Sequence, residues 1–579
     1  MQPRSVRFSL PAAVLLCSLP PAAPAANPGP HDVAVEVGVR ARMRDGVALA
    51  ADVYRPKAQG RFPVLLQRTP YDRRGARTDA RLLSSHGYIV VIQDTRGRYE
   101  SGGEWYPFLN ETNDGYDTVE WASGLPGANG KVGMFGGSYV GATQMLAAVG
   151  KPPHLEAIFP YVTASEYYDG WTYQSGVLMQ WFVQSWTSGL ARDTLNRKAE
   201  SRPLDWVKGA PNDYPVLTAP QPLALQLAPY YRNWLEHPTN DDYWKRWRIS
   251  DHYPELTVKA LHGGGWHDIF LKGSIKNYEG LSGAAKDPEA RAGQRLLVGP
   301  WAHAATSPEG KIGGVVFGKD AVLDMPQTIL EWSDWALKEK KNDYATRPPV
   351  KIFVMGENVW RYEKGFPLER QRLTRYYLHS TNGANGPGGD GLLSTSPPGE
   401  LPPDRFTYDP QNPVPTIGGR LCCANDVLPP GPFDQSPNEY RRDVLVYSTP
   451  PLERDVEVTG WVKLELFAAS GAHDPHFTAM LVDAAPDGYA RFLTDGIVRA
   501  SLRDSLETAA AGPRGETLRY EIDLWATSNL FRKGHQIRLY VSSSNFPRFS
   551  RMGGAPSEQT VYHDAKHPSA LVLPVIPRN

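Results

Sequence analysis

The sequence is poor in cysteine, carries no net charge and has no long apolar run beyond its first residues. Three cysteines in 579 residues cannot build a disulfide framework. Lys and Arg number 62, as do Asp and Glu, so no global charge attracts nucleic acid or an anionic membrane surface. These properties favour a soluble globular protein of roughly two to four domains.

The N-terminus reads as a secretory signal peptide over residues 1–26. Arg4 and Arg7 precede an apolar run at Phe8–Leu19, and Ala22–Ala26 supplies a small-residue cleavage site. The run is too short to span a bilayer. We therefore expect a secreted or periplasmic protein that has no membrane contact after cleavage.

Cleavage would remove Cys17 and leave only the adjacent pair Cys422 and Cys423. Lipid attachment at Cys17 is disfavoured by the bulky Leu16 before it. A vicinal disulfide would be strained, so two free thiols are the favoured reading, although the sequence leaves the disulfide open.

Alternating strand and helix patterns between residues 27 and 368 indicate an α/β protein with a mostly parallel sheet. Residues 27–45 read as a polar lead-in. The predicted strands end at loops rich in Gly and polar residues, and they lie at Val47–Tyr54, Phe62–Arg68, Gly87–Asp94, Lys131–Val132, Leu155–Tyr161, Thr257–Leu261, Arg295–Val298 and Val350–Met355.

Two segments depart from this alternation. Residues 165–249 are aromatic and helix-like, which indicates a helical cap inserted into an α/β domain at 27–164 and 250–368. From residue 369 to 579, short alternating runs are separated by Pro, Gly and Asn turns. That pattern predicts an all-β sandwich, a jelly roll.

The segment Gly133–Gly141 follows a predicted strand and precedes a predicted helix. A serine between glycines at such a turn is typical of a nucleophile elbow, which presents the Ser oxygen at the helix N-terminus. Here the spacing is G-x-S-x-x-G around Ser138, with Val140 where a second Gly is usual.

A serine nucleophile requires a base, and the base requires an acid that fixes its tautomer. On a doubly wound sheet these follow in the order Ser, acid, His on loops after strands. Asp268 fits the acid and His303 the base. His262 and His267 compete as bases, but both lie in the loop of the acid and leave the next loop empty.

The oxyanion hole requires two hydrogen-bond donors. The backbone N–H of Tyr139, the residue after Ser138, is one candidate. The phenol of Tyr71, at the end of an early strand, is the second, although from the sequence alone a packed tyrosine is the simpler interpretation.

Several long motifs resemble the cocaine esterase family, which also holds α-amino-acid ester hydrolases and Xaa-Pro dipeptidyl-peptidases. The resemblance covers nearly all of the chain after residue 26. It implies an α/β-hydrolase core, a helical cap and a C-terminal jelly roll. The G-x-S-x-x-G spacing is normal in this family. The resemblance further implies the triad Ser138, Asp268 and His303, with Tyr71 and the Tyr139 amide as oxyanion donors. The matching segments are Arg68–Asp72, Val91–Gly97, Val132–Gly141, Gly264–Asp268, Asn412–Gly419 and Ser542–Phe549.

The same resemblance implies an acyl pocket made of cap tryptophans, a Phe after the acid and a jelly-roll loop. The matching residues are Trp171, Trp186, Phe270, Cys422 and Cys423. The two thiols replace bulkier apolar residues, so the pocket is expected to be wider or differently shaped.

In the amino-acid ester hydrolases of this family, carboxylates just after the catalytic Asp hold the substrate ammonium. Here Ile269–Leu271 has no charge there, and a buried, unpaired ammonium is costly. Glu166 and Asp169 at the cap entrance remain alternative anions.

These observations predict an exported serine hydrolase that cleaves small-molecule carboxylic esters through an acyl-enzyme, without metal or organic cofactor. An Xaa-Pro dipeptidyl-peptidase or an amide or β-lactam acylase of the same family is the alternative. A carbohydrate- or partner-binding protein with a vestigial hydrolase core is a third reading. The sequence leaves open the natural substrate and whether the chain forms a homo-oligomer.

Overall fold

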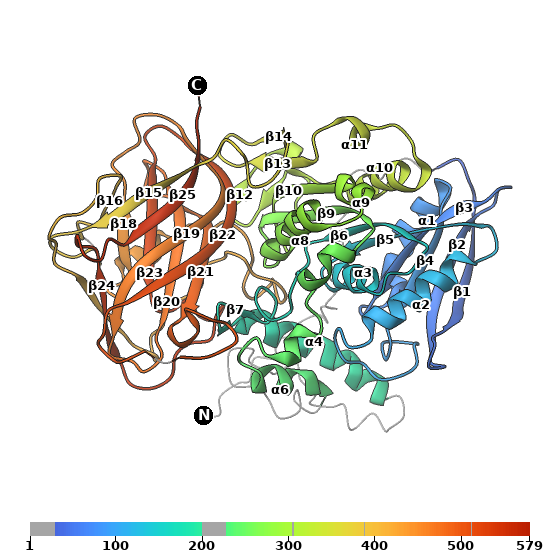
Figure 1. Ribbon diagram of the computed structural model, residues 1–579, viewed down its shortest axis with the longest axis horizontal. Coiled ribbons are helices and arrows are strands. Elements are labelled where there is room, and N and C mark those ends of the chain that lie inside the picture. Colours follow the sequence, from blue (N-terminus) through green and yellow to red (C-terminus); the bar gives the residue numbers. More distant parts are fainter. Residues whose placement is uncertain (1–28, 200–226, 304–305, 387, 511, 579) are drawn as a thin grey trace, which may run out of the picture.

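The computed structural model describes residues 29–199, 227–303, 306–386, 388–510 and 512–578. The chain forms an α/β core, a β-sandwich beside it, and a helical layer along one side of both (Figure 1). The predicted signal peptide lies outside the described residues. No helix in the described ranges is long and apolar enough to cross a membrane.

The core is built on a ten-stranded sheet that is parallel in its centre and antiparallel at both edges. Its strands follow the order β1 (Val33–Arg42), β2 (Ala48–Pro56), β4 (Ile89–Asp94), β3 (Phe62–Thr69), β5 (Ala128–Gly137), β6 (Leu155–Tyr161), β9 (Lys259–His267), β10 (Gln294–Ala302), β13 (Val350–Val354) and β14 (Val359–Glu363). This arrangement is the α/β-hydrolase core that the family resemblance implies.

Both faces of the central strands are buried, which explains their nearly continuous apolar sequences. In β3, Val64 and Leu66 face one hydrophobic cluster and Leu65 faces the other. The helices that cover the sheet are α1 (Arg77–Ser85), α2 (Glu111–Ser123), α3 (Tyr139–Val149), α8 (Leu271–Ala284), α9 (Pro288–Ala292), α10 (Met325–Lys338) and α11 (Asp343–Thr346). Residues of α2 and α3 share the cluster of Val64, and residues of α1 and α10 share that of Leu65.

The cap follows β6 and consists mostly of short helices packed through aromatic rings. Its elements are β7 (Tyr173–Gln174), β8 (Val177–Leu178), α4 (Gln180–Ala199), α6 (Pro229–Glu236) and α7 (Asp242–Lys245), followed by the 3₁₀ turn η3 (Ser250–Glu255). Trp186 of α4 stacks on Trp234 of α6 with ring centroids 6.0 Å apart. Residues 200–226 of the predicted cap lie outside the described residues.

The C-terminal part of the chain, from residue 369, is an all-β jelly-roll sandwich, as predicted. Its strands are hydrogen-bonded in the order β17 (Asp404–Tyr408), β24 (Ser557–Tyr562), β19 (Val456–Ser470), β25 (Ala570–Ile576), β15 (Arg372–His379), β16 (Leu392–Ser394), β18 (Leu445–Ser448), β23 (Gln536–Ser542), β20 (His476–Ala484) and β21 (Ala490–Arg499), with β22 (Leu518–Phe531) paired to β19.

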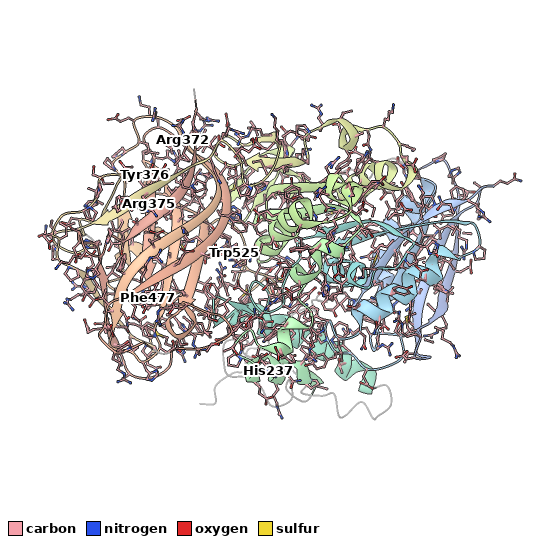
Figure 2. The ribbon with its side chains drawn as sticks, in the orientation of Figure 1. His237, Arg372, Arg375, Tyr376, Phe477 and Trp525 are labelled. Carbon is pink, nitrogen blue, oxygen red and sulfur yellow. The ribbon has the colours of Figure 1, made fainter. Side chains whose placement is uncertain are left out.

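The sandwich packs closely on the core. Figure 2 shows Trp525 of β22 on the side of the sandwich that faces the core, and its ring lies over the buried Arg420 guanidinium at 4.3 Å. Hydrophobic side chains of both parts belong to one continuous cluster. The sandwich is therefore in a position to contribute residues to a site in the core.

One prediction for the core is wrong. Residues 27–45 were expected to be a polar lead-in, but β1 (Val33–Arg42) is a full edge strand paired to β2. Most of its side chains are exposed or half-buried, and a bulge between Glu36 and Val39 interrupts the register. An edge strand with such weak burial leaves little hydrophobic periodicity in the sequence.

Candidate functional site

Ser138 lies at the turn between β5 and α3. Its backbone has φ 61° and ψ −129°, an uncommon conformation for a residue with a side chain. The Ser138 N–H donates to the carbonyl of Tyr161 at 2.9 Å, which ties the turn to the end of β6. The strain is therefore held by the sheet, and the serine oxygen stands at the N-terminus of a helix.

Two glycines explain the G-x-S-x-x-G spacing. Gly136 has φ 128°, and a Cβ there would lie 2.4 Å from Cγ1 of Val140. A Cβ on Gly141 would lie 2.8 Å from Cβ of Thr163. The first glycine makes room for the Val140 side chain, and the second lets α3 approach the segment after β6. Val140 is thus compatible with the elbow because Gly136 faces it.

The three predicted triad residues come together at the carboxyl ends of the strands. His303 Nε2 lies 3.1 Å from Ser138 Oγ, and His303 Nδ1 lies 2.6 Å from Asp268 Oδ2. The other oxygen of Asp268 accepts the N–H of Phe270 at 2.7 Å. Asp268 is fully buried and Ser138 is 5 % exposed. The imidazole therefore bridges the hydroxyl and a carboxylate that the backbone holds in place.

The competing histidines are engaged elsewhere. His262 is buried, with Nε2 2.9 Å from Oε1 of Gln294, and burial lowers its pKa to about 4. His267 is buried near the rings of Phe317 and Phe492. Burial, with the positive charges of two arginines, lowers its pKa to about 3. Both rings are neutral near pH 7, and among the described residues it is the His303 ring that meets Ser138 Oγ.

Tyr71 and Tyr139 approach the elbow in different ways. Trp186 of the cap donates its Nε1–H to the Tyr71 hydroxyl at 2.9 Å. The Tyr139 phenol is fully buried, accepts the Phe108 N–H at 2.7 Å and donates to Glu111 at 3.0 Å. The side chain of Tyr139 is thus turned into the protein, and only its backbone N–H remains as a candidate oxyanion donor.

The predicted acyl-pocket residues also meet. The rings of Trp171 and Phe270 stack at 4.2 Å with an interplanar angle of 7°, and Phe270 meets the His303 ring edge-on at 5.1 Å. Trp171 and Trp186 are 6.0 Å apart at nearly a right angle. These three aromatic side chains form an apolar wall beside the imidazole.

Cys422 and Cys423 lie in the same hydrophobic cluster as Trp171 and Phe270. Both side chains are buried. The carbonyl of Cys423 accepts the Nε1–H of Trp181 at 3.0 Å, which fixes this loop of the sandwich to helix α4. The vicinal disulfide that the sequence left open is not formed.

The two carboxylates at the cap entrance have partners. Asp169 is paired with the buried Lys272 at 2.7 Å, and Lys272 also reaches Asp523 of the sandwich at 2.9 Å. The Lys272 ammonium helps to hold the pKa of Asp169 below its usual value despite burial. Glu166 accepts the hydroxyl of Ser250 at 3.3 Å. Asp169 is therefore neutralised by the protein itself.

Sequence reasoning missed the residues that support this site. Glu111, Arg68 and Lys272 are charged and buried, which hydrophobic patterns do not reveal. A signal existed for two of them: Arg68 ends an apolar strand and Glu111 opens a helix. Their pairing at 2.7 Å depends on the strand order, which the sequence alone does not give.

A cavity of about 240 Å³ lies away from the triad. It is lined by Arg295, Glu331, Tyr344, Lys351 and Trp360, among others, and it lies near the start of β10, whereas His303 follows the end of that strand. It contains neither the elbow nor the triad residues.

Comparison with known proteins places the chain among hydrolases. A family model described as X-Pro dipeptidyl-peptidase (S15 family) matches residues 45–305, and the model for the C-terminal non-catalytic domain of X-Pro dipeptidyl-peptidases matches residues 342–572. The cocaine esterase of Rhodococcus sp. (strain MB1 Bresler) is 37% identical over 586 residues, which cover 95% of this chain and all of the relative.

Solved structures show the same fold. An aminopeptidase from a marine sediment archaeon (Thaumarchaeota archaeon) has a TM-score of 0.77 at 23% identity and covers 99% of both chains. An α-amino acid ester hydrolase has a TM-score of 0.77 at 23% identity and covers 98% of this chain and 100% of its own. Together with the identity to cocaine esterase over nearly the whole chain, these matches show that the protein is a serine hydrolase of the family that unites cocaine esterase, the α-amino-acid ester hydrolases and the S15 X-Pro dipeptidyl-peptidases.

Proposed function

We propose that the protein is an exported esterase that hydrolyses small carboxylic esters with an apolar acyl group through Ser138, His303 and Asp268. The observation that carries this proposal is the continuous contact from Ser138 Oγ through the His303 ring to Asp268, at 3.1 and 2.6 Å. A hydroxyl beside an imidazole that a buried carboxylate orients is the arrangement that activates serine as a nucleophile.

The reaction follows from this arrangement. Ser138 Oγ attacks the ester carbonyl as its proton passes to His303 Nε2, and the oxyanion accepts hydrogen bonds from Tyr71 and the Tyr139 N–H. The imidazolium, stabilised by Asp268, then protonates the leaving alcohol. A water molecule attacks the acyl-enzyme with His303 again as base, and the carboxylic acid leaves.

The acyl-side environment favours an uncharged substrate. The three residues after Asp268, Ile269–Leu271, are buried and apolar, and Phe270 stacks on Trp171 beside His303. A substrate ammonium buried there would find no carboxylate in this segment, and the nearby Asp169 is already bound to Lys272. The pocket is therefore better suited to an aliphatic or aromatic acyl group than to an α-amino acyl group.

Two of the comparisons point to the alternative activity, peptide cleavage. The matching family model is named for X-Pro dipeptidyl-peptidases, and one structural neighbour is an aminopeptidase. Both kinds of substrate carry a free amino terminus, which this pocket would have to desolvate. We place peptide cleavage second for that reason.

The deciding experiment measures hydrolysis of p-nitrophenyl acetate, butyrate and benzoate beside Ala-Pro-p-nitroanilide, with wild type and Ser138→Ala. Ester turnover that disappears in Ser138→Ala, with the anilide untouched, supports the esterase. Anilide turnover would instead mean that the cap holds an ammonium. No turnover of either class, in a protein that remains folded, would favour the binding protein with a vestigial core.

The preference for different acyl groups tests whether Cys422 and Cys423 line the acyl pocket. Because Cys422 and Cys423 pack with Trp171 and Phe270, a Cys422→Leu/Cys423→Phe variant should shift preference from benzoate toward acetate by narrowing the pocket. A Cys422→Ala/Cys423→Ala variant should not narrow it. Equal benzoate-to-acetate ratios in wild type and both variants would separate these residues from the acyl pocket.

Export rests on the sequence of the first 26 residues. Arg4 and Arg7 before an apolar run, followed by Ala22–Ala26, support cleavage near Ala25 or Ala26. Expression of the full chain in a Gram-negative host, with N-terminal sequencing of the periplasmic fraction, tests this. An intact N-terminus in the cytoplasmic fraction would contradict export.

A further inference from the structure

A buried ion pair lies behind the nucleophile elbow. The Tyr139 phenol donates to Oε1 of Glu111 at 3.0 Å, and Arg68 Nη1 binds Oε2 of the same carboxylate at 2.7 Å. All three residues are at most 3 % exposed. Burying a carboxylate costs free energy of desolvation, and Glu111 takes no direct part in the proposed reaction.

The contacts fix the Tyr139 ring from several sides. Its oxygen accepts the N–H of Phe108 at 2.7 Å, and the two rings stack at 5.2 Å. The ring also stacks on Trp186 at 6.0 Å and lies 5.2 Å from Trp105. A phenol that donates one hydrogen bond and accepts another has a single orientation, so the Glu111 carboxylate sets the direction of the O–H.

Tyr139 is also the first residue of α3, and its backbone N–H is the oxyanion donor proposed above. The ring and the amide belong to one residue. A ring clamped at its far end therefore restrains the position of the amide relative to Ser138. Oxyanion donors stabilise the transition state only if they are already aligned when charge develops.

Arg68, the other partner in the ion pair, lies close in sequence to Tyr71, the second proposed oxyanion donor. Arg68 is near the end of β3, three residues before Tyr71, and its carbonyl accepts the Thr143 hydroxyl of α3 at 3.2 Å. The Tyr71 N–H in turn donates to Oγ1 of Thr69 at 3.0 Å. Glu111 thus bridges the strand that precedes Tyr71 and the helix that begins with Tyr139.

We infer that Glu111 is a positioning residue: held by Arg68, it clamps the Tyr139 phenol and so aligns the two halves of the oxyanion hole. This inference rests on the proposed function of the Ser138 site. It assigns a catalytic effect to a buried side-chain contact, whereas a purely structural ion pair would affect only stability.

The test uses Tyr139→Phe, which removes the phenol oxygen and keeps the backbone N–H, and Glu111→Gln, which keeps an acceptor for the phenol but removes the charge that binds Arg68. Tyr88→Phe is the matched control, because Tyr88 is a buried phenol that donates to the Asp334 carboxylate at 2.7 Å, just before β4. Each variant is assayed with p-nitrophenyl butyrate and for inhibition by butylboronic acid, whose tetrahedral serine adduct reports the alignment of the oxyanion donors without turnover.

For Tyr139→Phe we expect kcat and the boronate affinity each to fall about 10- to 100-fold, the effect of a small misplacement of catalytic groups, while KM stays close to that of wild type. In Tyr88→Phe the melting temperature should fall with kcat unchanged. The double variant Tyr139→Phe/Glu111→Gln should lose little more activity than Tyr139→Phe alone, because the two residues act in one chain.

Wild-type kcat and boronate affinity in Tyr139→Phe would overturn the inference, whatever the melting temperature. If Glu111→Gln fails to fold, Tyr139→Phe still decides. Turnover that persists in Ser138→Ala would instead refute the proposed function. Loss of turnover in Ser138→Ala together with normal Tyr139→Phe kinetics would refute only the role of Glu111.

Discussion

The indole of Trp186 donates a hydrogen bond to the hydroxyl of Tyr71, with 2.9 Å between Nε1 and the phenol oxygen. This contact joins a cap helix to the loop after β3. It uses a lone pair of the phenol oxygen and not its hydrogen, and a phenol whose oxygen accepts a bond is a better donor through its own O–H. The cap therefore orients and polarises the hydroxyl that we propose as an oxyanion donor.

Replacing Tyr71 by Phe should lower kcat by about 10²- to 10³-fold, the usual effect of removing one oxyanion donor, with KM close to that of wild type. Trp186→Phe should lower kcat less, because Tyr71 keeps its own hydrogen. Steady-state kinetics with p-nitrophenyl butyrate check both. A larger kcat loss in Trp186→Phe than in Tyr71→Phe would contradict this order.

Asp268→Asn should lower kcat by about 10⁴-fold, because an amide cannot stabilise the imidazolium or select the tautomer that accepts the Ser138 proton. The fold should survive, since the side-chain oxygen that accepts the Phe270 N–H at 2.7 Å can be retained. In a Ser138→Ala background the same substitution should cost nothing further. A loss of kcat of less than tenfold in the single variant would contradict the assignment of Asp268 as the acid of the triad.

Much of the site could be predicted from the sequence because its main residues stand at the ends of strands that are buried on both faces. β6 (Leu155–Tyr161) has the predicted bounds. The strands before Asp268 and His303 were found, but β9 and β10 continue to His267 and Ala302, so His262 and His267 lie in a strand and not in the predicted loop. The order Ser, acid, His is the one found in the α/β-hydrolase fold. The edge strand β1 was missed because so few of its side chains are buried.

The contacts that support the site could not be predicted in this way. Trp186 of the cap reaches Tyr71 across 115 positions of sequence, and Asp169 meets Lys272 across 103. Each of these contacts joins two layers of the fold. A local pattern gives the face on which a side chain stands, but not which layer will cover it.

Lys272 should be essential for stability. Its ammonium joins Asp169 near the cap, helix α8 and Asp523 of the sandwich, and its surroundings raise its pKa because two carboxylates outweigh desolvation. Lys272→Met should lower the free energy of unfolding by about 3–5 kcal/mol, since it leaves buried charge unpaired. Urea unfolding measures the loss.

Two further variants serve as controls for this measurement. Asp169→Asn/Lys272→Met should recover part of the stability, because the more buried carboxylate is then neutral. Lys463→Met breaks a more exposed pair with Glu521 and should change stability by less than about 1 kcal/mol. Equal losses in Lys272→Met and Lys463→Met would show that the buried ion pair contributes no more to stability than the exposed one.

Acid should destabilise the protein partly through His476 of the sandwich. Burial, reinforced by Arg499, lowers the pKa of this histidine from 6.5 to about 4. Between these values the unfolded chain binds a proton that the native state does not, so stability falls as the pH falls from about 6.5 to 4. Asn does not titrate, so His476→Asn should show a shallower fall in the urea midpoint over that window, whatever its stability at pH 7. Parallel curves for the two proteins would mean that His476 is protonated equally in both states.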